Sequence, residues 1–263
     1  MNLATLKFGV DAHVATVTLN RPDVRNAFNE TVIEELTGAF RALATNDDVR
    51  VIVLAAEGVA FCAGADLNWM KKMAGYSDAE NRADAMTLAV MLNTIYRCPK
   101  PVIARVQGDA YAGGVGLAAV ADVVVAVDTA HFCLSEAKLG LIPATIGPYV
   151  IRALGEQASR RYFLTAERFA ASTAQRHGLV HEVVSADALD GTVQALAKAL
   201  AENSPNAVNE CKRLVQDFAS RVIDDGAITD TAERIAKIRA SEEGREGVRS
   251  FLEKRAPSWR SAD

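Results

Sequence analysis

Gly108–Ala119, the stretch GDAYAGGVGLAA, decides the fold, because an apolar strand leads there directly into glycines and a short helix. Glycine lacks a Cβ, so the backbone can turn sharply at these positions and a ligand can approach it closely. The first N–H groups of the following helix have no partner inside the helix and can bind an anion. The sequence therefore predicts a site for negative charge at this turn.

Strands and helices alternate on the N-terminal side of this stretch. Residues 13–20 alternate apolar and polar side chains, which is typical of a half-buried strand. Asn29 is suited to cap a helix that ends before Asn46, and residues 49–55 form an apolar run that predicts a buried strand. Together these segments indicate a βαβ unit.

The alternation continues around the glycine stretch itself. The spacing of apolar residues predicts a helix over 79–96, strands over 102–106 and 122–127, and a short strand over 132–134. From residue 159 onward the pattern is almost wholly helical. The fold class is therefore α/β, with helices at its C-terminal end.

Two regions follow from this change of pattern. We predict a core domain over residues 1–195 and a C-terminal helical region over residues 196–263. Helices that lack a core of their own must pack on the parent domain or on a neighbouring subunit. We therefore expect a homo-oligomer.

Composition and charge exclude several classes of protein. Of 263 residues, 50% are hydrophobic, and the net charge of −4 gives no excess of lysine and arginine for nucleic acid or a membrane surface. The four cysteines lie far apart, the four histidines have no metal-like spacing, and no metal site is expected. No signal peptide or spanning segment is evident, so a cytoplasmic protein is expected.

A dinucleotide site is one interpretation of the glycines, because Gly114–Ala119 fits the loose pattern G-x-G-x-x-A. The helix available between the two flanking strands has only about eight residues, which is short for a crossover. Asp128 also comes too early for the acid that binds a ribose. These spacings disfavour a nucleotide cofactor.

Three segments taken together are more specific: Phe61–Asp66, Gly108–Leu117 and Leu134–Pro143. With these segments the sequence resembles the enoyl-CoA hydratase/isomerase (crotonase) superfamily, and the resemblance covers nearly the whole chain. Within the superfamily, Phe61–Met70 and Phe132–Glu136 are most similar to bacterial methylglutaconyl-CoA hydratases.

The resemblance implies a crotonase-like spiral of ββα units with a C-terminal helical region that forms trimers or dimers of trimers. It also implies an acyl-CoA thioester as substrate, so that coenzyme A belongs to the substrate and no separate cofactor is expected. When such a thioester enolises, backbone N–H donors can stabilise the carbonyl oxygen by about 3 kcal/mol each. By resemblance these donors belong to Ala65 and Gly113. The alternative is that the glycines only permit turns and close packing.

Glu136 matches a catalytic glutamate of the superfamily, which would transfer a proton beside the thioester. Residue type alone favours the alternative that it is an exposed acid at the start of a helix, because most glutamates are solvated. Apolar residues flank it at 132–134 and 139–141, so we predict an apolar setting that raises its pKa.

Gly116 departs from the pattern, because a typical hydratase of this family has its second catalytic glutamate there. Hydration is usually divided between two carboxylates, whereas moving a double bond needs only one base. Gly116 therefore favours an enoyl-CoA isomerase, while the similarity at 61–70 favours a hydratase of a branched 2-enoyl-CoA. Loss of the acid also leaves open a catalytically silent acyl-CoA-binding protein.

The resemblance also implies a set of substrate-binding residues. Arg25 would line the CoA channel, and the C-terminal pair would reach CoA across a subunit contact, although a solvated helix face explains the lysine equally well. The tryptophan would shape the acyl pocket or belong to the ordinary core. The set comprises Arg25, Ala63, Asp66, Leu67, Trp69, Gly114, Gly116, Phe251 and Lys254.

Overall fold

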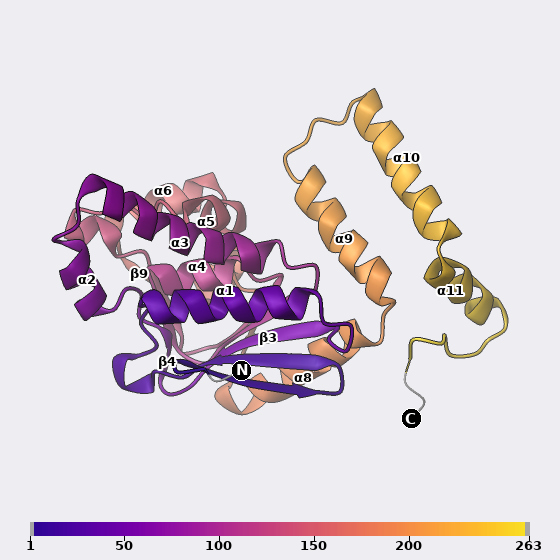
Figure 1. The fold of residues 1–263 in the computed structure, drawn as a ribbon, viewed down its shortest axis with the longest axis horizontal. Helices are drawn as coiled ribbons and strands as arrows, with labels where there is room; N and C mark the ends of the chain where they lie inside the picture. Colours follow the sequence, from indigo (N-terminus) through magenta and orange to yellow (C-terminus); the bar gives the residue numbers. More distant parts are fainter. Residues whose placement is uncertain (1–2, 261–263) are drawn as a thin grey trace.

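The computed structural model describes residues 3–260, in which helices cover two β-sheets (Figure 1). The larger sheet has six strands in the order β1-β2-β3-β5-β7-β10, and all neighbours are parallel except β1 and β2. These strands are β1 Leu6–Asp11, β2 Val14–Leu19, β3 Val51–Ala56, β5 Val102–Val106, β7 Val123–Val127 and β10 Glu182–Val184.

The smaller sheet has four strands in the order β4-β6-β8-β9, namely β4 Ala60–Cys62, β6 Asp109–Tyr111, β8 His131–Cys133 and β9 Arg168–Ala170. Each of β3, β5 and β7 in the larger sheet is followed along the chain by a strand of the smaller sheet. Helices come after each pair, so the chain winds through successive ββα turns. The expected spiral is confirmed.

Eleven helices are described in residues 3–260, and α8 packs against β3, β5 and β7 while α1 packs against α3 (Figure 1). Asn29 caps α1 as predicted, because its side chain accepts a hydrogen bond from the Val32 N–H at 3.0 Å. The helices are α1 Glu30–Ala44, α2 Leu67–Met73, α3 Asp78–Tyr96, α4 Gly113–Ala119, α5 Gly147–Leu154, α6 Glu156–Thr165, α7 Ala171–His177, α8 Leu189–Ala201, α9 Pro205–Phe218, α10 Asp225–Ala240 and α11 Glu242–Leu252.

The core is continuous along the central strands of the larger sheet. Every residue of β3 is buried, and β5 and β7 are buried along most of their length. Each fully buried valine or leucine there contributes roughly 1.5–3 kcal/mol relative to an exposed one. This packing fixes where the strand ends lie, and the strand ends carry the candidate site.

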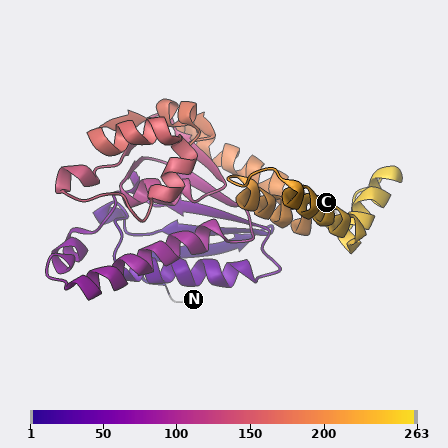
Figure 2. The same cartoon turned by 90° about the horizontal axis from the view of Figure 1, so that it is seen from above.

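The last three helices, α9, α10 and α11, project away from the core (Figures 1 and 2). Polar contacts attach α9 to the core: Lys212 Nζ donates to Asp122 Oδ2 at 2.6 Å and to the Lys100 carbonyl at 3.1 Å. The predicted division at residues 195 and 196 falls inside α8, which belongs to the core. The division between the two regions stays a prediction. The helices that project away from the core begin at Pro205.

Five strands were not predicted from the sequence. β4, β6, β9 and β10 have three residues each, too few to show an alternation of side chains. β4 includes Phe61 and Cys62, which were expected in a loop, and β9 and β10 interrupt the region expected to be wholly helical. β1 has one buried residue, Leu6, followed by five exposed ones, so no alternation marks it. No helix among residues 3–260 is both long and apolar enough to span a membrane.

Candidate active site

The candidate site lies where three neighbouring strands of the smaller sheet end. β4 pairs with β6, and β6 pairs with β8, all in parallel. The carboxyl ends of parallel strands meet at one edge of a sheet, where ligands bind in open α/β folds. The segments that follow these strands are 63–66, 112–113 and 135–136, so the fold brings together three parts of the chain that are distant in sequence.

A tight turn after β6 sets the position of Gly113. Ala112 has φ 47° and ψ −115°, a backbone conformation that costs roughly 1–3 kcal/mol in a residue with a Cβ. The Ala112 N–H donates to the Cys133 carbonyl at 2.8 Å, which ties the turn to β8. Gly113 is then the first residue of α4, and within residues 3–260 its N–H has no acceptor.

Ala65 belongs to the loop after β4. The Phe28 N–H donates to the Gly64 carbonyl at 2.7 Å, and the Asp66 N–H donates to the Phe28 carbonyl at 2.7 Å. Phe28 and Ala65 thus form a parallel bridge in which the Ala65 N–H points away from Phe28. Nothing in the described part of the chain accepts a hydrogen bond from it.

The two donor loops touch each other. Gly64 has φ +90°, and a Cβ built on it would lie 3.0 Å from the Ala112 Cβ. A Cβ on Gly114 would lie 2.9 Å from the Cys62 Cβ, so α4 also packs tightly on the end of β4. Glycine is needed at both positions, because any side chain would separate the loops that carry Ala65 and Gly113.

Glu136 follows β8 and begins a short 3-10 helix, Glu136–Leu139. Its carboxyl oxygen Oε2 is buried and has no hydrogen-bond partner among residues 3–260. Burial raises the pKa of the Glu136 carboxyl above its ordinary value, which is the predicted direction. Of the two flanks expected to be apolar surroundings, residues 132–134 are buried, but Leu139 and Leu141 are 60% and 52% exposed. A carboxyl group whose pKa is raised in this way accepts a proton more readily than an ordinary glutamate and can act as a general base and then as a general acid.

The space beside Gly116 is filled. A Cβ built on Gly116 would lie 2.7 Å from the Ile146 Cβ, and only 2% of Ile146 is exposed. Ile146 precedes α5, which packs against α4. The role of Ile146 was not predicted, because nothing in the local sequence around Ile146 shows that its side chain packs against Gly116.

Arg25 and Ala63 lie together, as the resemblance implied. The Ala63 N–H donates to the Arg25 carbonyl at 3.0 Å, and both residues line a cavity of about 270 Å³. Asp109 and Tyr111 of β6 line the same cavity, so it opens along the smaller sheet next to the donor loops.

Asp66 and Trp69 carry structural contacts. The Asp66 carboxylate accepts the Asn68 N–H at 2.8 Å, caps α2, and pairs with Arg21 at 2.9 Å. Burial alone would raise the pKa of Asp66, but these hydrogen bonds hold it below its usual value. Trp69 is 4% exposed and donates from Nε1 to Asp84 at 3.0 Å, whereas Leu67 is 74% exposed.

Phe251 and Lys254 lie elsewhere in this chain. Phe251 is on α11, and Lys254 follows it with φ 55°, whereas α11 and β4 stand at opposite ends of the molecule in Figure 1. Phe251 is 82% exposed. Within one chain the structure does not bring this pair to the other site residues, so their contact with CoA stays a prediction.

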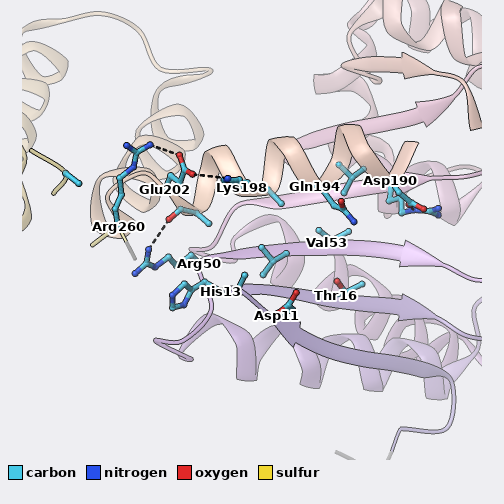
Figure 3. A pocket seen from close by; sticks show the side chains of 17 residues that line it. Asp11, His13, Thr16, Arg50, Val53, Asp190, Gln194, Lys198, Glu202 and Arg260 are labelled. Atoms are coloured by element: carbon cyan, nitrogen blue, oxygen red, sulfur yellow. Dashed lines mark hydrogen bonds and ion pairs between the residues drawn. The ribbon is translucent and has the colours of Figure 1, made fainter. Parts of the chain in front are cut away.

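A second cavity, of about 1060 Å³, lies between the β1–β2 hairpin, α8 and the C-terminal segment (Figure 3). Several of its charged groups are engaged: Arg50 donates to the Ala201 carbonyl at 3.0 Å, and Arg260 pairs with Glu202 at 2.5 Å. None of the predicted site residues lines it. The candidate site is therefore at the strand ends of the smaller sheet and not in this larger cavity.

Comparison with known proteins agrees with this geometry. The family model for enoyl-CoA hydratase/isomerase matches residues 9–262. The 2,3-dehydroadipyl-CoA hydratase of Escherichia coli is 33% identical over 94% of this chain and 95% of its own length.

Two solved structures share the whole fold. An enoyl-CoA hydratase from Shewanella pealeana is 44% identical, with a TM-score of 0.95 over 98% of this chain and 97% of that one. An enoyl-CoA hydratase from Mycobacterium smegmatis is 36% identical, with a TM-score of 0.93 over 98% and 100% of the two chains. Sequence, fold and relatives agree that this chain belongs to the enoyl-CoA hydratase/isomerase family and has the crotonase fold.

Proposed function

We propose that the protein is a lyase that hydrates a 2-enoyl-CoA thioester through an enolate. The observation that carries this proposal is the buried, unpartnered Oε2 of Glu136 at the same sheet edge as two N–H donors without acceptors in residues 3–260. The donors, from Ala65 and Gly113, form an oxyanion hole for the thioester carbonyl oxygen. Glu136 moves the proton.

The proposed reaction needs one carboxylate. As the water oxygen bonds to C3, Glu136 accepts a proton from that water, and the electron pair of the double bond moves onto the thioester oxygen. The protonated Glu136 then donates the same proton to C2 as the enolate returns to a carbonyl. The raised pKa of Glu136 suits this exchange, because a carboxyl group that must accept and then release a proton works best near the operating pH.

The second candidate is an isomerase that converts a 3-enoyl-CoA into a 2-enoyl-CoA. Ile146 favours it, because its side chain fills the place into which a carboxylate at position 116 would extend. Glu136 would take a proton from C2 and return it to C4, while the same two N–H groups hold the enolate. Both candidates therefore share one site and differ in whether water reaches C3.

The proposed substrate is branched and resembles methylglutaconyl-CoA. The support is the similarity of residues 61–70 and 132–136 to hydratases of that kind. A distal carboxylate on the acyl group would need a cation nearby. Lys72 is already paired with Glu30 at 2.8 Å, so Lys71 and Arg82 of α2 and α3 are the better candidates.

The proposed assembly is a homotrimer or a dimer of trimers. Apolar side chains in the projecting C-terminal region support it, since Ile223 in the connection between α9 and α10 is 86% exposed and Phe251 on α11 is 82% exposed. In such an assembly the α11 of one subunit would approach the CoA channel of its neighbour. Sedimentation analysis giving a single monomeric species would contradict this proposal.

One set of assays separates the candidates. Purified protein is incubated with crotonyl-CoA, methylglutaconyl-CoA and a 3-enoyl-CoA, and the absorbance of the conjugated thioester is followed. Its loss indicates hydration, and its appearance indicates isomerisation. Glu136→Gln should abolish either activity, whereas Glu34→Gln, an exposed position on α1, should leave it unchanged. Full activity in the Glu136→Gln variant would exclude the proposed mechanism.

A further inference from the structure

Phe28 contacts both loops that supply the proposed N–H donors. It is 1% exposed and lies between Asn26 and the cap of α1. Its backbone is hydrogen-bonded on either side of Ala65, and its ring packs against Gly113. The mechanism proposed above gives Phe28 no role.

The backbone of Phe28 sets the direction of the Ala65 N–H. In a parallel bridge, the bridged residue has its N–H and C=O directed away from its partner, while the residues on either side bond to that partner. The two bonds from Phe28, to the Gly64 carbonyl and from the Asp66 N–H, are both 2.7 Å long. The Ala65 N–H is thereby directed out of the loop and held there.

The ring of Phe28 sets the position of Gly113. A Cβ built on Gly113 would lie 2.5 Å from Phe28 Cε2 and 2.8 Å from Cδ2, so the ring edge rests against the glycine backbone itself. Any shift of the ring toward or away from this position changes the distance between the Gly113 N–H and the loop that carries Ala65.

Phe28 is itself held firmly. The neighbouring Asn26 is 1% exposed, and its Nδ2 donates to the Glu57 carbonyl at 2.8 Å and to the Ala60 carbonyl at 2.9 Å. The Asn26 Oδ1 accepts the Arg21 N–H at 2.9 Å. All three bonds are made within the chain, and they hold the segment that leads into Phe28.

We infer that Phe28 is the positioning residue that fixes the spacing of the two oxyanion donors, through its backbone to Ala65 and through its ring to Gly113. The inference rests on the proposed function, because it concerns the same oxyanion hole. Phe28 touches no reacting atom and acts only through the two donors. Misplacing a donor by about 1 Å lowers a rate by up to 100-fold, so the effect belongs in kcat.

The first test compares two buried phenylalanines. Phe28→Leu removes the ring edge and keeps the backbone bonds, whereas Phe40→Leu removes a fully buried ring from α1 far from either loop. Phe28→Leu should lower kcat by about 10- to 100-fold with little change in KM, while Phe40→Leu should keep kcat at a similar loss of Tm. If Phe28→Leu does not fold, Phe28→Met, which keeps the volume without a ring, replaces it. Equal kcat losses in both variants would overturn the inference.

The second test measures hydrogen bonding from the two donors to a bound thioester that does not react. The infrared band of a carbonyl-labelled butyryl-CoA, a saturated thioester that cannot be hydrated, is measured free and bound. Hydrogen bonds from two aligned donors should shift the band of the bound thioester to lower frequency, and Phe28→Leu should reduce this shift while Phe40→Leu does not. No shift in the wild type would count against the oxyanion hole itself. A normal shift in Phe28→Leu would count against the role of Phe28 alone.

A double variant provides the third test. Gly113→Ala places a methyl group against the Phe28 ring and should reduce kcat strongly. In the Gly113→Ala background, Phe28→Leu makes room for that methyl, so the double variant should lose less than the product of the two single losses. Independent, multiplicative losses would show that the ring does not act through Gly113.

Discussion

Ile146 fills the space that a side chain at position 116 would need. The Cβ of Ile146 lies 2.7 Å from the position that a Cβ on Gly116 would take. The glycine is therefore not an open gap in the site. The two residues fit each other, and the pair makes the wall of α4 apolar at the position where a second acid would otherwise be found. A change at either residue alone should be poorly tolerated.

Restoring a glutamate at position 116 should require two substitutions. Gly116→Glu alone would overpack the site, which typically costs about 1–3 kcal/mol, and should lower Tm without faster hydration of crotonyl-CoA. Ile146→Gly removes both the Cγ2 and the Cβ that a side chain at position 116 would meet. The double variant should therefore regain part of the lost Tm and hydrate about tenfold faster than Gly116→Glu, part of what a placed acid supplies. Ile151→Ala, on the exposed side of α5, is the control and should rescue neither property.

The pH profile should report the raised pKa of Glu136. The mechanism begins with the carboxylate form, so kcat/KM should fall as pH drops through the raised pKa of Glu136. That limb should lie above the pH at which an ordinary glutamate titrates. A profile that stays flat down to the ordinary glutamate pKa of about 4.3 would contradict this assignment.

The raised pKa of Glu136 also predicts that stability and activity depend on pH in opposite directions. Activity should fall as pH drops, whereas stability should fall as pH rises. Burial favours the protonated carboxyl of Glu136 in the folded protein, so its contribution to stability is present at low pH and is lost as pH rises through the raised pKa. At neutral pH, Glu136→Gln should therefore be inactive yet melt a few degrees higher than the wild type. At acid pH the two Tm values should converge, and scanning calorimetry across pH would measure this.

We expect the Asp66 carboxylate to stabilise the folded protein, because it caps α2 and pairs with Arg21. Asp66→Ala removes the cap of α2 and the pair with Arg21, so we expect a loss of about 1–3 kcal/mol in the free energy of unfolding at neutral pH. Because the pKa of Asp66 is lowered, this loss should shrink as pH falls through that lowered pKa. Asp47→Ala, an exposed aspartate, is the control, and urea unfolding measures both.

The ion pair of Lys212 and Asp122, whose side chains are 8% and 29% exposed, should hold α9 to the core. Lys212→Met leaves the partly buried Asp122 carboxylate without its partner, and we expect a loss of about 1–3 kcal/mol in the free energy of unfolding. The double variant with Asp122→Asn should recover most of that cost, while Lys237→Met on exposed α10 should have little effect. Hydrogen exchange should show the loss first in α9, and uniform exchange along the chain would contradict this attachment.

Much of the fold follows from local sequence signals. The Asn29 cap, the apolar run of β3 and the glycine turn before α4 each use a signal contained within a few residues. The family resemblance added the order of the ββα turns, which no single segment shows. The apolar flanks of Glu136 were enough to predict the direction of its pKa.

The residues that were missed have partners far along the chain. Phe28 meets Gly113, and Ile146 meets Gly116, but a glycine shows nothing in sequence about the side chain that will pack on it. The short strands β6, β9 and β10 form because neighbouring strands supply their hydrogen bonds, not because of their own residues. Such features arise from tertiary packing and need the structure.

The hydrogen bond from the Ala112 N–H to the Cys133 carbonyl joins the Gly113 turn to the strand that precedes Glu136. The segments that carry the proposed donor and the proposed base thus follow two strands, β6 and β8, that are paired with each other. Because this bond and the pairing of β6 with β8 join the two segments, we expect the separation of donor and base to change less than the positions of the surrounding helices. We therefore expect substitutions in α2 and α3 to leave the spacing of the proposed donor and base unchanged.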